Sequence, residues 1–351
     1  MKPFSPTSHS LAKTLTIRMS PHVGATASVD RIMFNVVLAL VPVCGYAIYA
    51  FGIAAILVLA TAVASCVLTE HVLCRISGKD TTIGDWSAVI TGLLYGLILP
   101  PSLPLWMVAA GGVLAIGVGK FLFGGLGYNP FNPSLVGRAI LQATFPSAMT
   151  TWLSAPEARF QSIPSSSVAF PLMKPVYDGV TAATPLSQWK FSQVPTDTGQ
   201  LFLGTVPGST GETCAALILL GGAYLIARRM MSWRIPVSIL VTVAVLSGLL
   251  HLIDPQRYAG PLFMLLSGGL MLGAVFMATD MVSSPITHAG RVLYGMLIGT
   301  LTVVIRVWGG VPEGIMYAIL IGNAVAPHLD NWIQPRLYGA KNLKAETGAT
   351  G

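Results

Sequence analysis

Charged residues are scarce in this chain of 351 residues, where Asp, Glu, Lys and Arg together make up only 9%. An ordinary soluble domain carries roughly a quarter charged residues. Because 53% of the residues are hydrophobic and the mean hydropathy is +0.71, the chain could not cover its own surface in water. The scarcity of charge therefore excludes an ordinary soluble enzyme and predicts that lipid is the solvent for most of the chain.

Several motifs with well-known chemistry are also missing. No C-x-x-C pair is present, so neither a zinc site nor a disulfide framework is indicated. The net charge of +7 is not gathered into a nucleic-acid module, and no Walker, Rossmann or Ser-His-Asp pattern is present. We therefore expect no nucleic-acid partner, and we expect thiols packed among helices at Cys44, Cys66, Cys74 and Cys214.

Apolar segments fill most of the sequence and predict an all-α polytopic membrane protein of about ten transmembrane helices. Several are shorter than the ~20 residues of a full span and are rich in Gly, so we expect some helices to be broken or tilted. The segments are Ile32–Ala50, Ile53–Leu68, Trp86–Leu99, Leu105–Gly119, Leu135–Met149, Cys214–Ala227, Ile235–Leu252, Pro261–Ala278, Val292–Val307 and Gly314–Ala326.

The placement of Lys and Arg predicts the orientation of these spans. With the N-terminus inside and ten spans threaded, the inside segments hold 14 of the 20 basic residues, so both termini should be cytoplasmic. The predicted order is a cytoplasmic segment (1–30), a first membrane half (31–150), a long periplasmic loop (151–211), a second membrane half (212–330) and a cytoplasmic tail (331–351).

The two membrane halves resemble one another. Gly-punctuated helices occur at similar depth in each, at Gly92–Pro100 and Gly268–Thr279, and Asn-x-Pro elements close both halves, at 129–133 and 323–327. Five spans per half would turn the second half upside down relative to the first. The pattern favours inverted repeats with broken helices, from which many transport proteins build a central site.

The long loop contains the segment Asp178–Leu186 (DGVTAATPL). Thr184 offers a hydroxyl that could take a phosphoryl group. Pro185 is expected to hold the residue before it extended and to keep the segment out of a helix. Asp178 and Thr181 are placed for a turn or for reading by a modifying enzyme. Taken alone, the spacing is more typical of an ordinary Asx-turn.

This segment resembles the flavinylation motif of the D subunit of the Rnf electron-transport complex and of the B subunit of the sodium-pumping NADH:quinone reductase. Asp178, Gly179, Thr181, Ala183 and Thr184 match it, while Ala182 stands where the family usually has Gly. Further matches cover essentially the whole chain, and the length favours the Rnf D subunit. They are Gly127–Gly137, Met277–Pro285 (with Met281 where Pro is commoner), Pro312–Tyr317 and Asn323–Asp330.

The resemblance implies a subunit of a bacterial inner-membrane complex that passes electrons between ferredoxin and NAD and moves H⁺ or Na⁺. It implies FMN joined to Thr184 through a phosphoester by a flavin transferase, with Asp178 and Thr181 in the motif. It also implies a second, non-covalent flavin (riboflavin) within the helices. The implied partners are membrane lipid and the A, B, C, E and G subunits of the complex. The competing hypothesis is a stand-alone channel or transporter with no cofactor.

Polar residues within membrane segments are candidates for functional contacts. Arg138 could contact a flavin or balance a charge, or its side chain could snorkel to water near the inner interface. Asp280 is expected either to cap a helix end or to contact a cation or flavin. We expect Lys120 to snorkel, and the Asn-Pro pair at 129–133 to mark a helix break.

Overall fold

The protein is all-helical in its computed structural model, which describes residues 28–152, 160, 165–171, 173, 183–194, 196–204, 206–211 and 214–334. Five helical stretches in these ranges are long and apolar enough to cross a membrane, namely Val29–Phe51, Ile53–Ile76, Leu105–Phe123, Arg234–Ile253 and His288–Trp308. Two shorter apolar helices, Ser87–Leu97 and Ala215–Ala227, accompany them. The prediction of an all-α membrane protein is confirmed.

The first half of the chain contains six α-helices. They are α1 (Val29–Phe51), α2 (Ile53–Ile76), α3 (Ser87–Leu97), α4 (Leu105–Gly117), α5 (Pro133–Thr144) and α6 (Pro146–Met149). Short 3₁₀ turns at Ile83–Asp85 (η1) and Phe121–Phe123 (η2) lie before α3 and after α4. The fifth predicted segment was wrong as a single helix, because Pro146 begins a new one and α5 ends at the residue before Phe145.

The predicted long loop contains three short helical elements in its described part: η3 (Ser165–Val168), α7 (Pro185–Ser192) and α8 (Thr198–Leu203). A Ser-, Thr- and Pro-rich composition alone would be typical of a flexible linker. The expectation that Pro185 keeps its segment out of a helix was wrong, because Pro185 occupies the first helical position of α7, where a proline is tolerated. Here Thr184 and Asp197 cap α7 and α8, because each side-chain oxygen accepts a hydrogen bond from a backbone N–H three residues on.

The second half comprises α9 (Ala215–Ala227), α10 (Arg234–Ile253), α11 (Pro261–Leu266), α12 (Leu270–Leu272), the π-helical η4 (Gly273–Met277), α13 (His288–Trp308) and α14 (Ile315–Trp332). The predicted span Pro261–Ala278 is therefore broken between α11 and α12. Gly268 occupies the break at φ 65°, a left-handed conformation that Gly adopts without the steric cost of a Cβ. The expectation that some spans are broken is confirmed here.

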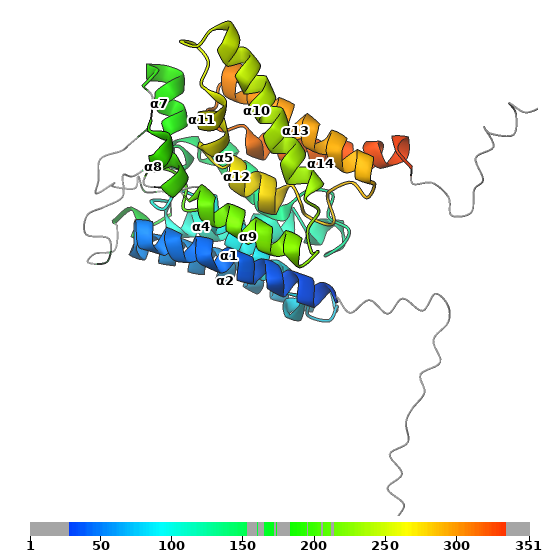
Figure 1. Cartoon of the computed structure of the whole chain (residues 1–351). Helices are drawn as coiled ribbons and strands as arrows, with labels where there is room; N and C mark the ends of the chain where they lie inside the picture. The colour runs from blue at the N-terminus through cyan, green and yellow to red at the C-terminus, as the bar shows by residue number, and fades with distance from the viewer. Residues whose placement is uncertain are drawn as a thin grey trace, which may run out of the picture.

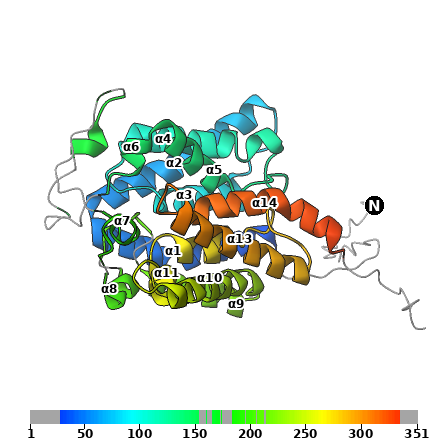
Figure 2. The same ribbon diagram turned by 90° about the horizontal axis from the view of Figure 1, so that it is seen from above.

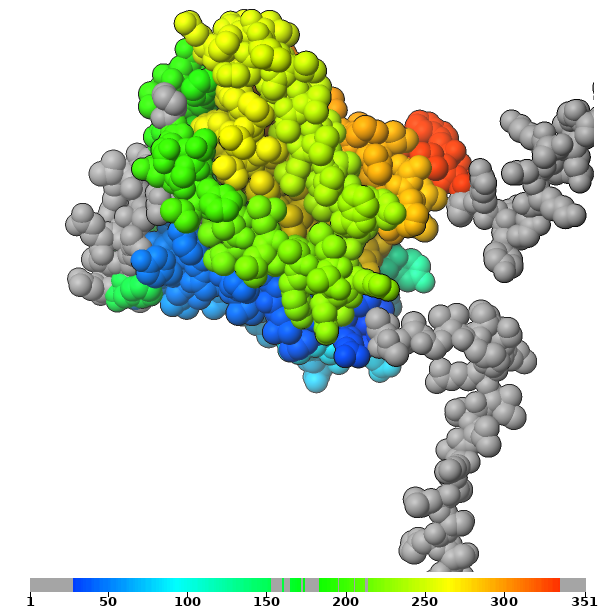
Figure 3. Space-filling model, viewed as in Figure 1, coloured from blue at the N-terminus to red at the C-terminus, as the bar shows by residue number. Residues whose placement is uncertain are grey.

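The helices form a bundle with two distinct ends (Figures 1 and 2). α1 begins and α14 finishes at one end, which we call the terminal end, while α7 and α8 stand at the opposite end, which we call the α7 end (Figure 1). Seen from above, α2, α4 and α5 lie on one side of the bundle and α9, α10 and α11 on the other (Figure 2). In the space-filling view, α9 and α10 form much of the visible face (Figure 3).

The two halves pack their long helices through the same pair of small residues. A Cβ on Gly112 of α4 would lie 2.0 Å from Ser65 Oγ of α2, and one on Gly295 of α13 would lie 1.8 Å from Ser238 Oγ of α10. Both serines donate to the carbonyl three residues back, at Ala62 and Ile235. Small residues let helix backbones approach closely, which is the main source of helix association in lipid.

This packing predicts the effect of enlarging Gly295. Gly295→Ala should destabilise the protein by about 1–3 kcal/mol, because the new methyl group overlaps Ser238 and lies 3.0 Å from the Ile235 carbonyl oxygen. Gly248→Ala in α10 is the matched control, since no atom lies within 4 Å of its added Cβ. Thermal unfolding in detergent should show a lower midpoint for Gly295→Ala only. Equal midpoints for the two variants would contradict the packing argument.

Candidate functional site

Thr184 lies at the α7 end, at the N-terminus of α7. Its backbone is extended, and Pro185 occupies the first helical position. Its Oγ1 accepts a hydrogen bond of 3.3 Å from Ser187 N and donates one of 3.2 Å to Ser187 Oγ. The residue is only 4% exposed, so the predicted hydroxyl acceptor is buried beside a helix N-terminus.

α7 is held on the bundle by Lys190. The Lys190 ammonium donates to three backbone carbonyl oxygens, at Arg306 (2.9 Å), Gly309 (2.5 Å) and Val311 (3.3 Å). These oxygens lie at the C-terminal end of α13, where carbonyls lack partners within the helix and a cation is favoured. Partial burial lowers the pKa of Lys190. Lys190 thus joins the helix that carries Thr184 to the end of a membrane helix.

The break between α11 and α12 lies directly beside α7. A Cβ on Gly268 would come within 2.6 Å of Leu186 Cδ1, so the second residue of α7 packs onto the break. Arg306 is buried there and donates to the carbonyls of Met264 (2.5 Å) and Ser267 (2.9 Å). One guanidinium therefore satisfies backbone groups that the broken helix leaves open.

The predicted long loop (151–211), which we call the far segment, makes a corresponding contact with the first half at its C-terminal end. Thr210 donates to the Leu99 carbonyl from its backbone N–H (3.1 Å) and its hydroxyl (2.7 Å), and Gly211 N donates to the Leu97 carbonyl (2.7 Å). These carbonyls lie at and just beyond the end of α3. The Thr184 end of the far segment therefore packs against the third predicted span of the second half. Its Gly211 end is hydrogen-bonded to the third predicted span of the first half.

Asp178 and Thr181, the other two motif residues, lie outside the described residues. Their predicted part in flavinylation stays a prediction.

A pocket at the terminal end is lined by residues from both halves of the chain. Its cavity volume is about 90 Å³, and its polar lining residues are Ser87, Thr91, Lys120, Asn129, Asn132, Thr279 and Asp280. Asp280 Oδ1 accepts from Val282 N at 3.4 Å and Oδ2 accepts from Ser283 Oγ at 3.1 Å, which closes a turn between η4 and α13. The capping interpretation was wrong, because Ala278 is the C-cap of η4 and Thr287 is the N-cap of α13. Because Asp280 also lines the pocket, its predicted contact with a cation or flavin stays a prediction.

The Asn-Pro elements of the two halves meet beside this pocket. Asn132 caps α5 by accepting from Ser134 N (3.1 Å) and donates through Nδ2 to the Met277 carbonyl (3.2 Å). The Asn323 amide lies 2.6 Å from the Tyr294 hydroxyl and, with its oxygen facing α5, accepts from Asn132 N at 3.1 Å. The first element is thus a capped helix start, as expected, and it also joins the two halves.

Arg138 lies away from that pocket, at the interface of α5 and the start of α14. Its Nη2 is 2.5 Å from Glu313 Oε2, and both side chains are mostly buried. The interpretation of a side chain snorkelling to water was wrong, because Arg138 is 5% exposed and pairs with Glu313 inside the bundle. Arg138 balances a charge between the halves, and the structure does not bring it together with Asp280.

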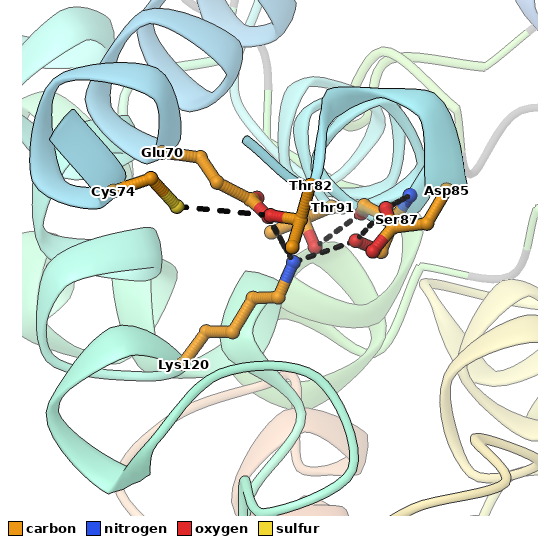
Figure 4. A network of polar contacts seen from close by, with 7 residues as sticks. All are labelled: Glu70, Cys74, Thr82, Asp85, Ser87, Thr91 and Lys120. Carbon is orange, nitrogen blue, oxygen red and sulfur yellow. Dashed lines mark hydrogen bonds and ion pairs between the residues drawn. The ribbon is translucent and has the colours of Figure 1, made fainter. Parts of the chain in front are cut away.

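Lys120 is the centre of a polar network at the edge of the pocket (Figure 4). Its ammonium donates to both oxygens of Glu70 (2.8 and 2.9 Å) and to Ser87 Oγ (2.6 Å). Thr82 donates to Glu70, and Ser87 Oγ donates to Asp85 (2.5 Å). The expectation that Lys120 snorkels was wrong: it is 3% exposed and Glu70 is 2% exposed, so they form a buried ion pair.

Sequence reasoning missed Glu70, although one signal was present. A carboxylate near the end of an apolar run is rarely buried without a cationic partner. Lys120 was a candidate partner on a neighbouring predicted span, but the choice needed the packing of α2 against α4.

The ion pair predicts a specific pattern of stability. Lys120→Met should lower stability by about 3–5 kcal/mol, because it leaves the Glu70 carboxylate buried without its counter-charge. Adding Glu70→Gln to Lys120→Met should recover most of that loss. Lys79→Met, at an exposed lysine near the same end of α2, is the control. Thermal unfolding midpoints measure the effect, and a double variant no more stable than Lys120→Met would refute the pairing.

Comparison with known proteins matches residues 16–339 to the model of the NQR2, RnfD, RnfE family. The D subunit of a proton-translocating ferredoxin:NAD(+) oxidoreductase complex from Clostridium ljungdahlii is 41% identical over 93% of this chain and 96% of its own. The D subunit of a Na(+)-translocating ferredoxin:NAD(+) oxidoreductase complex from Acetobacterium woodii is 40% identical over 95% of this chain and 98% of its own. The D subunit of an ion-translocating oxidoreductase complex from Stutzerimonas stutzeri is 39% identical over 89% and 93%. The chain therefore belongs to the NQR2, RnfD, RnfE family.

Proposed function

We propose that the protein is the FMN-carrying membrane subunit of a complex that couples electron transfer between ferredoxin and NAD to ion translocation. It contributes to a translocase and is not catalytic alone. The relatives that span its whole length are D subunits of complexes named for this reaction. The chain supplies no recognised nucleotide-binding motif of its own, so ferredoxin and NAD would bind to other subunits of the complex.

The position of Thr184 carries the flavin part of the proposal. Its hydroxyl lies at the N-terminus of α7, where free N–H groups and the helix dipole favour negative charge. A phosphoester at this oxygen would place its remaining negative charge beside those groups. The residues present therefore fit a phosphate-linked cofactor, which when bound supplies one- or two-electron chemistry.

The anchoring of α7 determines what the chain does for such a cofactor. Lys190 and Leu186 fix α7 to the end of α13 and to the α11–α12 break. A covalent link on an anchored helix would keep the flavin at one place on the bundle at permanent high local concentration. The chain's own residues thus bind and orient the carrier.

Burial of the Thr184 hydroxyl also sets an order of events. A transferase cannot reach a side chain that is 4% exposed with α7 docked. We infer that flavin is attached before α7 packs against the bundle, or while α7 is displaced from it.

A test of the attachment compares three variants in a host that contains the transferase. Thr184→Val should abolish the fluorescent band of the denatured chain under ultraviolet light, because no hydroxyl remains, whereas Thr184→Ser should retain some flavin. Thr198→Val, at an exposed threonine of the same far segment, should leave the band unchanged. A wild-type chain without fluorescence would instead favour the stand-alone channel or transporter.

The pocket at the terminal end is the site we propose for the second, non-covalent flavin. It is mostly apolar with a few convergent polar groups, as small-molecule sites are. Asn129 Oδ1 is buried there without a hydrogen-bond partner, so it could accept a hydrogen bond from a ligand. The Lys120 ammonium would add positive charge at the edge of the site.

Flavin released by denaturation measures this second site separately. Asn129→Leu should reduce the flavin that leaves the chain on acid denaturation by about tenfold, through loss of a hydrogen bond and a shape change. The covalent band at Thr184 should persist and serves as the internal control. Undiminished release from the variant would exclude this pocket.

We also propose that ten spans form two inverted repeats, with both termini in the cytoplasm of a bacterium and the Thr184 segment in the periplasm. Three observations support this arrangement: the matched glycine–serine contacts, the helix breaks or short helices at the third span of each half, and the placement of α7 opposite the ends of α1 and α14. A lipid bilayer, a flavin transferase and the A, B, C, E and G subunits are the proposed partners.

A further inference from the structure

A second pocket at the terminal end contains three arginines. It adjoins the proposed site of the non-covalent flavin, with which it shares Met230, Met231, Thr279 and Met281. It lies between the end of α9, the start of α10 and the start of α13, and its cavity volume is about 430 Å³. Arg229, Arg234 and Arg291 line it, together with Ser232 and Ser284. The positive charge comes from three different parts of the chain.

In the described part of the chain, no carboxylate oxygen lies within 4.0 Å of these three guanidinium groups. Neither salt bridge of that part includes any of the three arginines. Arg291 Nε donates to the Pro285 carbonyl (3.0 Å), and the Arg234 guanidinium lies 5.3 Å from the ring centre of Trp233. These contacts orient the side chains without cancelling their charge, so the pocket favours an anion.

Two further observations point to a ligand at the same place. Ser232 Oγ is buried and has no hydrogen-bond partner. α10 begins here with Trp233 as its N-cap and no side-chain cap, so its first N–H groups lack the partner that most helix starts have. A phosphate oxygen would satisfy both the hydroxyl and the N–H groups while facing the arginines.

The surface next to the pocket is suited to acyl chains. Trp233 is 50% exposed at the pocket rim, where an amphipathic ring typically lies at headgroup level. From there an exposed apolar stripe runs along α10 at a spacing of four residues, formed by Val237, Val241, Val245 and Leu249. Figure 3 shows that α10 is on the outside of the bundle.

We propose that this pocket binds the phosphate of an anionic phospholipid, whose acyl chains lie along the α10 stripe. The arginines and the start of α10 hold the phosphate, and the valines contact the hydrocarbon. Free phosphate shares the headgroup chemistry but would gain nothing from the stripe. The proposal goes beyond the proposed function and does not depend on either flavin.

The test uses the purified complex in mild detergent, with native mass spectrometry of bound lipid after delipidation and re-addition. Wild type should retain phosphatidylglycerol in preference to phosphatidylcholine. Arg234→Gln/Arg291→Gln should retain it at least about tenfold more weakly, since each basic contact to an anionic lipid contributes roughly fivefold. Arg75→Gln, an exposed arginine at the same end of the bundle, is the control and should behave as wild type.

Three results would overturn the proposal. One is equal retention of the two lipids by wild type, and another is an equal loss of retention in Arg75→Gln. The third is displacement of phosphatidylglycerol by excess inorganic phosphate, with phosphate raising the thermal unfolding midpoint as much as the lipid does. That result would make the ligand free phosphate. If the double glutamine variant fails to assemble, Arg234→Lys/Arg291→Lys decides. It should retain part of the preference, because lysine keeps the charge but loses the bidentate geometry.

Discussion

The structure depends on satisfying backbone carbonyls where membrane helices stop short or break. In lipid each unsatisfied polar group costs several kcal/mol, so irregular backbone is tolerated only with partners from protein. Arg306 supplies donors to Met264 and Ser267 at the α11–α12 break. Thr210 and Gly211 supply donors to the carbonyls at the end of α3. Partners at both places are therefore part of the fold.

The need for partners at these backbone carbonyls also fixes the position of the far segment. Lys190 binds the carbonyls at the end of α13, including that of Arg306, whose side chain satisfies the neighbouring break. Thr184 caps the same short helix that carries Lys190. The helix that offers the hydroxyl is thus connected through one side chain to the broken span. The proposed flavin carrier would be part of the bundle's end rather than a free tether.

Much of this architecture was predictable from composition and local pattern. Charge scarcity and apolar segments gave the class of protein. The Gly-rich segments indicated that some spans are broken, and the structure has such a break at Gly268. The start of α7 was not predicted, because Pro185 was expected to keep its segment out of a helix. A threonine followed by proline is nevertheless a typical N-cap and first helical position. The division at Phe145 could have been inferred from Pro146 in the same way.

Contacts between distant segments were not predictable, because they depend on how helices pack. Lys120 was expected to snorkel to water, but its ammonium is hydrogen-bonded to Glu70 of α2, which is 50 positions away in the sequence. Arg138 pairs with Glu313 across 175 positions. A sequence shows that such charges lie in apolar surroundings, and only the folded chain shows which partner makes their burial tolerable.

Peptide mass spectrometry of the native complex tests the central claim most directly. The tryptic peptide that ends at Lys190 contains both Thr181 and Thr184. The account predicts that this peptide carries the mass of a phosphate-linked FMN and that fragment ions place it on Thr184. An unmodified peptide from a host with an active transferase, or a modification placed on another residue, would contradict it.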